Sequence, residues 1–230
     1  MRRLLHQPLD PVCRKIRLAL AEKKLAFETN TVRPWERREE FLALNPASEA
    51  PVMIEPDGTI VSNHRVIIDY LDEVYRDPDG GLVLLPGGPV ERAEARRIAE
   101  WFDVKFAEEV TLNLVDEKIT RRFLPRDLGG GPPDTEAVRI GMHNVGYHLD
   151  YISFLVERRN WLAGDMLTVA DLAAAAHLSS VDYLGNVPWA DFPEAKEWYA
   201  RIKSRPSFRA LLADHVAGMP AASHYANLDF

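Results

Sequence analysis

The sequence predicts an α/β domain at the N-terminus followed by an all-helical domain. Short β-branched runs alternate with helical patterns at the start of the chain, which is typical of an α/β unit. A stretch rich in glycine and proline then marks a boundary, and beyond it apolar residues recur at helical spacings. We therefore expect a first domain at 1–78, a linker at 79–89, a helical domain at 90–212 and a C-terminal tail at 213–230.

Four strands and three helices are expected in the first domain. A strand–helix–strand beginning implies a parallel pair with a right-handed crossover, and a following hairpin adds an antiparallel edge. The expected strands are 4–6, 26–32, 51–54 and 59–61, and the expected helices are 12–24, 39–44 and 63–74.

Residues typical of strand starts, turns and helix caps mark the ends of the hairpin and of the helix after it. Pro51 can head a strand because no ladder donor is needed there, and Pro56-Asp57-Gly58 has turn chemistry. Ser62 or Asn63 can cap the next helix. The apolar face predicted for that helix consists of Val66, Ile67, Tyr70, Leu71 and Val74.

The helical domain is expected to hold a long helix at 90–120, a mobile glycine-rich loop at 125–133 and a second long helix at 136–158. Thr168 and Asp171 have the spacing of a capping box. The helix that follows them, at 172–184, is almost wholly apolar, which predicts the buried centre of the domain.

Composition excludes several classes of protein. Apolar residues make up 47% of the chain, and the net charge is −7, which argues against nucleic-acid binding. Cys13 is the only cysteine, so an intrachain disulfide is impossible. No apolar run approaches the roughly 18 residues of a membrane span, and no signal peptide is evident. A cytoplasmic protein without membrane insertion is expected.

Several of these features together resemble the glutathione transferase family. They are Pro51 after Ala50, the helix ending in Tyr70-Leu71, the capping box at Thr168, and the closing segment Ser204-Arg205-Pro206-Ser207-Phe208. The resemblance covers about residues 4–212. It implies a thioredoxin-like first domain, an all-α second domain, and a homodimer formed through the helices after Val90.

The catalytic position of that family is altered here. Many bacterial members read Ser-Pro-Phe-Cys where this chain reads Asp10-Pro11-Val12-Cys13. A carboxylate at Asp10 would repel a neighbouring thiolate, which is the wrong sign for glutathione chemistry. The alternative interpretation is that Asp10 caps the following helix. Cys13 is either a redox thiol near a helix N-terminus or an inert packing residue, and the second is favoured.

The ligand-gripping pair of the family is also replaced. Asn63 and His64 stand where relatives have Glu-Ser, and a slip of one residue, to Ser62-Asn63, would still lack the acid. With Ala50 and Pro51 these residues would form a degenerate glutathione site. No cofactor and no metal are expected, although the helix N-terminus could still hold an anion weakly.

Two segments are candidates for partner binding. Trp35 lies among Arg33, Arg37 and Arg38, and tryptophan and arginine are enriched in binding hot spots. A tryptophan packed on its own domain beside solvated charges is the alternative.

The tail is the second candidate. Pro220 prevents a simple helical extension, and the end contains Tyr225, Asp229 and Phe230. It could fold back over the protein or bind a partner.

These departures resemble one branch of the family, whose members bind filaments of the bacterial division protein FtsZ. The resemblance implies a non-catalytic role in cell division and septal wall synthesis, FtsZ filaments as partner, location at the division site, and a second division protein as a candidate partner of the tail. The alternative is a glutathione S-transferase or another glutathione-dependent thiol enzyme.

Overall fold

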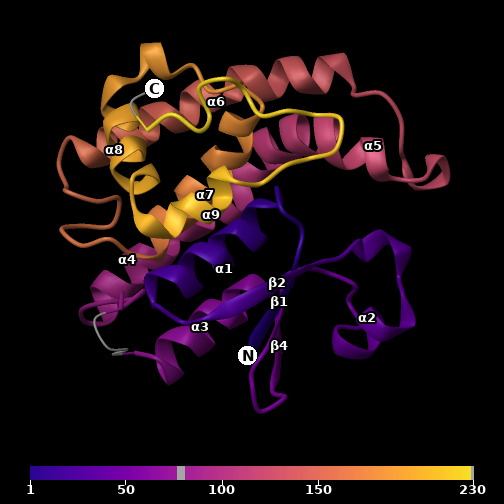
Figure 1. Ribbon diagram of the computed structural model, residues 1–230. Coiled ribbons are helices and arrows are strands. Elements are labelled where there is room, and N and C mark those ends of the chain that lie inside the picture. Colours follow the sequence, from indigo (N-terminus) through magenta and orange to yellow (C-terminus); the bar gives the residue numbers. More distant parts are fainter. Residues whose placement is uncertain (77–80, 229–230) are drawn as a thin grey trace.

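A computed structural model describes residues 1–76 and 81–228. Figure 1 shows the N-terminal α/β domain in the lower half of the molecule and the helical domain above it. This arrangement confirms the predicted fold class. The predicted boundary between domain and linker, at 78–79, lies outside the described residues.

The N-terminal domain is built on a four-stranded sheet in the order β2-β1-β3-β4. β1 (Arg2–His6) pairs in parallel with β2 (Phe27–Thr31), as the crossover rule predicts. β3 (Val52–Ile54) runs antiparallel to both β1 and β4 (Ile60–Ser62), so β4 is the expected antiparallel edge. The Ala50–Pro51 peptide before β3 is cis.

Among the described residues three α-helices complete this domain, α1 (Pro11–Glu22), α2 (Glu39–Leu44) and α3 (His64–Val74), and a 3₁₀ turn at Pro34–Glu36 carries Trp35. The face predicted for α3 is partly wrong. Ile67, Ile68 and Leu71 are buried and face α1, whereas Val66 and Val74 are each 54% exposed. At 100° per residue, positions 67, 68 and 71 share one stripe of the helix, and 66, 70 and 74 lie on the next.

The helical domain begins with one long continuous helix. Its first part is α4 (Pro89–Glu100), and Trp101–Thr120 continues with π-helical hydrogen bonds. Buried side chains recur in this second part every four or five positions, which fits the wider i→i+5 turn. They include Phe102, Phe106, Val110, Leu114 and Ile119. The predicted long helix is therefore confirmed in position and differs in type.

The chain then passes through α5 (Arg121–Phe123) and a 3₁₀ turn (Arg126–Leu128) before α6 (Thr135–Val156). Tyr147, Tyr151 and Phe154 share one face of α6, as their spacing predicts. Tyr147 and Phe154 are largely exposed on that face. An exposed aromatic stripe on a helix is unusual for a monomer and is relevant to assembly.

Helix α7 (Val169–Tyr183) is the centre of the domain, and every one of its residues is buried. It packs against α1, α4 and the π-helical segment. The predicted capping box is present: Thr168 accepts a hydrogen bond from the Ala170 N–H, and the Asp171 carboxylate accepts one from the Thr168 N–H. α8 (Pro193–Lys203) and α9 (Arg209–Leu212) close the domain, with 3₁₀ turns before each, at Trp189–Asp191 and Pro206–Phe208.

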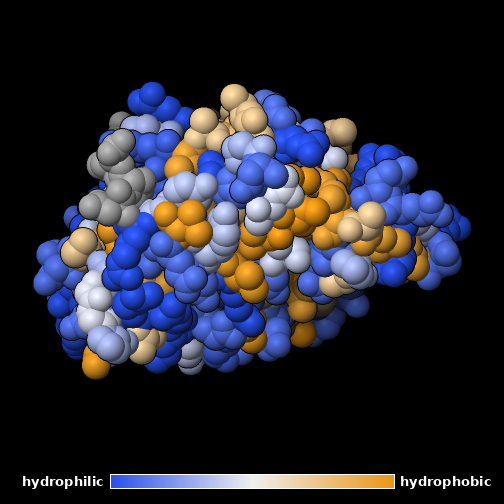
Figure 2. Space-filling model, turned by 90° about the horizontal axis from the view of Figure 1, so that it is seen from below, coloured by the Kyte–Doolittle hydropathy of each residue, from blue (hydrophilic) through white to orange (hydrophobic). Residues whose placement is uncertain are grey.

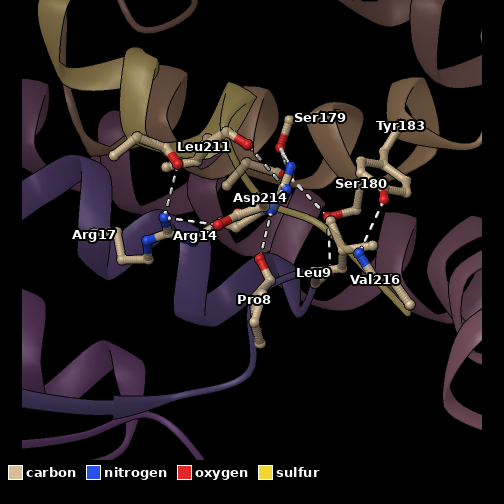
Figure 3. A network of polar contacts seen from close by, with 12 residues as sticks. Pro8, Leu9, Arg14, Arg17, Ser179, Ser180, Tyr183, Leu211, Asp214 and Val216 are labelled. Atoms are coloured by element: carbon tan, nitrogen blue, oxygen red, sulfur yellow. Dashed lines mark hydrogen bonds and ion pairs between the residues drawn. The ribbon is translucent and has the colours of Figure 1, made fainter. Parts of the chain in front are cut away.

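The described part of the tail folds back over the protein. The Arg14 guanidinium on α1 donates to Ser179 on α7 and pairs with Asp214, which also pairs with Arg17 (Figure 3). Tyr225 is completely buried, and its hydroxyl accepts a hydrogen bond from Arg14.

The prediction that Tyr225 contacts a partner is therefore corrected, because its ring belongs to the core. The predicted contacts of Asp229 and Phe230 lie outside the described residues.

Figure 2 views the molecule from below, and hydrophobic residues form a band across the middle of that face while hydrophilic residues cover its ends. Exposed apolar side chains of the N-terminal domain include Ile60, Val66 and Val74. None of the described helices has the length and apolar character needed to cross a membrane.

Candidate functional site

The start of α1 holds the altered catalytic position. The Asp10 carboxylate accepts a hydrogen bond of 2.8 Å from the Cys13 N–H, so it caps α1 as the alternative interpretation predicted. Cys13 is fully buried. Burial and the neighbouring Asp10 carboxylate raise the pKa of the Cys13 thiol well above its ordinary value. A thiol in this setting stays protonated and is a poor nucleophile.

The degenerate ligand pair follows β4. Asn63 has a left-handed φ of 73°, which asparagine tolerates better than most residues. Its side-chain oxygen accepts from the Arg65 N–H at 2.9 Å and from the Val66 N–H at 3.5 Å. Two donors of the helix N-terminus are thus already engaged, and a ligand carboxylate would have to displace Asn63 to use them.

His64 points toward the core of the interface between the domains. The Lys15 ammonium donates to His64 Nδ1 at 2.7 Å and also pairs with Asp103 on the π-helical segment. His177 on α7 lies 3.5 Å from the other Asp103 oxygen and 3.0 Å from the Thr111 hydroxyl. We call Lys15, His64, Asp103 and His177 the His64 cluster.

Burial and the Lys15 ammonium lower the pKa of His64 to about 3, so the ring is neutral at physiological pH and its Nδ1 accepts a hydrogen bond from the Lys15 ammonium. Burial alone would raise the pKa of Asp103. The Lys15 ammonium has the largest opposing effect, His177 and His64 add to it, and together they hold the pKa of Asp103 below its ordinary range. The His64 cluster therefore pairs its charges within the chain, at the place where the resemblance puts the ligand-gripping pair. Asp103 Oδ1 and His177 Nε2 face each other at 3.5 Å, and neither forms a hydrogen bond among the described residues. Among the described residues no group of three or more His, Cys, Asp or Glu side chains is placed to hold a metal ion.

A groove of about 680 Å³ opens between the two domains and shares His177 with the His64 cluster; we call it the Trp35 groove. The loops after β1 and β2 form one side, the π-helical segment forms another, and the tail closes it at His215 and Val216. Most of its lining is apolar. The apolar lining includes Leu9, Val12, Trp35, Leu112, Val115 and Ile119.

Two carboxylates also line the Trp35 groove. Asp10 and Asp116 are half-buried, and no lysine or arginine among the described residues forms an ion pair with either. The Thr120 hydroxyl donates to Asp116 at 2.8 Å. Burial raises the pKa of both carboxyl groups, and Asp10 raises that of Asp116 further by repulsion.

Asp116 was not among the residues predicted from the sequence. The only sequence signal for it is a pair of acids, Asp116 and Glu117, between the apolar positions Val115 and Ile119 on the long helix.

The basic loop is less basic than its sequence suggests. Glu36 pairs with Arg33 at 3.2 Å and with Arg38 at 2.6 Å, while Arg37 is exposed. Trp35 is half-buried and lines the groove. The structure thus brings Trp35 and Arg33 together with Asp10, but it keeps Tyr225 away from them in the core.

Comparison with known proteins is consistent with this geometry. The family model for the glutathione S-transferase N-terminal domain matches residues 11–74, and the one for its C-terminal domain matches 133–206. FtsZ-localized protein A of Caulobacter vibrioides is 46% identical over 100% of this chain and 98% of its own length.

Solved structures agree as well. The structure of FzlA from C. crescentus superposes with a TM-score of 0.92 at 46% identity, covering 100% of this chain and 99% of the other. A structure described as a glutathione S-transferase from Rhodospirillum rubrum F11 superposes with a TM-score of 0.94 at 52% identity, covering 100% of both chains.

Proposed function

This chain belongs to the glutathione S-transferase family, in the group that includes FtsZ-localized protein A, and from that premise we propose that it binds FtsZ filaments and regulates bacterial cell division. The observation that carries the proposal is the 46% identity to FtsZ-localized protein A along the whole chain. Through FtsZ the protein would act at the division site in the cytoplasm and promote septal wall synthesis.

The site supports a binding role over catalysis. A glutathione enzyme needs a hydroxyl or thiol that stabilises the thiolate and an acid that holds the ligand amino group. In this chain Asp10, which caps α1, stands at the position of the hydroxyl or thiol. Asn63, which caps α3, stands at the position of the acid.

A glutathione-dependent enzyme is the second candidate, because the similar protein from Rhodospirillum rubrum is described as a transferase. Calorimetric titration of glutathione at millimolar concentration separates the two. A dissociation constant below roughly 0.1 mM (about −5.5 kcal/mol) would favour the enzyme.

We assign the FtsZ contact to Trp35 and the groove beside it. Trp35 offers a partly exposed aromatic anchor, and hot spots favour such residues at the edge of a pocket. Arg37, and Arg33 and Arg38 where a partner displaces Glu36, would orient an acidic partner surface at the rim.

The test is co-sedimentation with FtsZ polymer. The wild-type protein should pellet with the polymer at micromolar concentration and remain in the supernatant without it. Absence of pelleting across the micromolar range would contradict the proposal.

A homodimer fits the exposed aromatic stripe of α6, where Tyr147 and Phe154 are largely exposed. A two-fold dimer would bury each copy of this stripe and would present two FtsZ-binding faces, which bridge filaments by multivalency. Light scattering should give twice the chain mass of 26.0 kDa. A monomer at micromolar concentration would contradict this assembly.

We propose that the end of the tail binds a second division protein. Removing residues 224–230 would also remove the buried Tyr225 and destabilise the core. A truncation after Asn227 spares that ring. It should leave FtsZ co-sedimentation unchanged and weaken only the second interaction.

A further inference from the structure

The Trp35 groove combines an apolar wall with two carboxylates, and no lysine or arginine among the described residues forms an ion pair with either. Leu112 is largely exposed at this wall, and Val115 and Ile119 form its floor. Asp10 lies at one end of α1, and Asp116 lies on the π-helical segment opposite. Asp10 accepts a hydrogen bond from the Cys13 N–H and Asp116 accepts one from the Thr120 hydroxyl. The two partly desolvated carboxylates still repel each other across one apolar space, and a cation between them would relieve that repulsion.

The neighbouring cations do not serve this purpose. Arg33, at the rim, is paired with Glu36. Lys118, next along the helix, donates instead to Asn186 at 2.8 Å. His177 lines the groove and lowers the pKa of Asp10 by its charge, but its ring nitrogens lie against Thr111 and Asp103. His215 stands on the tail side of the groove. The charge of the groove interior is therefore opposite in sign to the arginine-rich loop at its edge.

We propose that the groove receives a lysine or arginine side chain, carried on an apolar segment of the partner protein, between Asp10 and Asp116. This inference rests on the proposed function for the identity of the partner, FtsZ. The apolar stem of the basic residue would lie along Trp35 and Leu112, and its charged head would reach the carboxylates. Arginine is favoured where it can also stack on the indole.

The substitutions Asp10→Asn and Asp116→Asn remove the charges and keep the shapes. Asparagine is as good a helix cap as aspartate, so α1 stays capped. In Asp116→Asn the new amide oxygen would still accept from the Thr120 hydroxyl. Asp191→Asn is the matched control, because Asp191 is an exposed acid in the helical domain outside the groove lining.

In co-sedimentation with FtsZ polymer, the double variant should bind at least about tenfold more weakly than the wild type. The wild-type affinity should fall between about 50 and 300 mM KCl, and the double variant should lose most of that dependence. Asp191→Asn should match the wild type. A double variant that binds like the wild type, with the same salt dependence, would overturn the inference.

A second measurement works without FtsZ. n-Hexylammonium and n-hexanol share an apolar chain and differ in charge. The chain has five tryptophans, so their indole N–H signals can be followed by ¹H–¹⁵N NMR, with Trp35→Phe identifying one of them. The ammonium should shift the Trp35 signal at about tenfold lower concentration than the alcohol, and the double variant should abolish that preference.

The two measurements separate the possible failures. If wild-type protein ignores FtsZ but prefers the ammonium, the proposed function fails and the cation-binding groove stands for another partner. Equal shifts by ammonium and alcohol would overturn the inference even if FtsZ binds. A preference for the ammonium combined with unchanged FtsZ binding by the double variant would also count against it.

Discussion

The His64 cluster and the Trp35 groove both lie between the two domains, and both contain charges removed from water. In the His64 cluster each charge has a partner from within the chain: Lys15 meets Asp103, and His64 accepts from Lys15. In the Trp35 groove, Asp10 and Asp116 accept hydrogen bonds from the Cys13 N–H and the Thr120 hydroxyl, but neither forms an ion pair with a lysine or arginine among the described residues. The first region is closed and holds the domains together, and the second is open and available to another molecule.

The two regions therefore have different roles: the paired charges of the His64 cluster stabilise the fold, and the carboxylates of the Trp35 groove can contribute to binding. A region whose charges are paired internally gains less from a charged ligand than a region whose charges have no ionic partner. Removing a charge should therefore cost stability in the first region and binding in the second.

The largest expected effect is on the closed region. Asp103→Ala leaves the buried Lys15 ammonium unpaired, which should lower the free energy of unfolding by about 3–5 kcal/mol. Urea denaturation followed by circular dichroism measures it. Asp116→Asn, the comparison in the groove, should change stability by less than about 1 kcal/mol. Similar losses of stability in Asp103→Ala and Asp116→Asn would contradict the distinction between a closed and an open region.

Lowering the pH should reduce the free energy of unfolding because of His64 in the closed region. Its pKa is lowered to about 3 in the folded protein against an ordinary 6.5, so the unfolded chain binds more protons between these values. Stability is therefore lost as the pH falls below about 6.5. The loss from this group is roughly 1.5 kcal/mol between pH 6.5 and 5.

His64→Gln is the matched variant for that effect. Glutamine can still accept from Lys15 but does not titrate. His6 and His148, whose pKa values are lowered to about 4, remain in both proteins. The difference between the two urea-denaturation series across pH thus isolates His64, and parallel curves would show that His64 is not the group responsible.

In the open region, Trp35→Ala should act on binding alone. Truncating a hot-spot tryptophan costs about 2 kcal/mol or more, roughly thirtyfold in affinity. Co-sedimentation with FtsZ polymer should therefore be lost at micromolar concentration, with the circular dichroism spectrum and the assembled mass unchanged. Arg37→Glu should weaken binding less. If Trp35→Ala binds normally, Trp35 is only a packed surface residue.

The smallest expected effect is that of restoring a hydroxyl at the altered catalytic position. Neither the wild type nor Asp10→Ser should conjugate glutathione to an aromatic electrophile above the uncatalysed rate. The helix N-terminus is still capped by Asn63, and His64 still lies in its cluster. Absorbance assays at millimolar glutathione test this. Clear turnover by the wild type would favour the enzyme.

Much of the fold could be predicted because its signals are local. Asp10, Asn63 and the pair Thr168–Asp171 each cap a helix through hydrogen bonds that span two or three residues. Such contacts depend only on residue type and spacing. The same is true of the turn at Gly58 and of the apolar helix α7. For this reason the sequence by itself determined the order of elements and the residues that cap α1, α3 and α7.

Only the tertiary structure decided which distant side chains meet. Lys15 reaches His64 across 49 residues and Asp103 across 88. Arg14 bonds Tyr225 across 211 residues, which turned a predicted partner contact into part of the core. Asp116 lines the same groove as Asp10 because the π-helical segment lies across that groove from the start of α1. Long-range pairing follows from how elements pack in three dimensions, and no spacing along one chain encodes it.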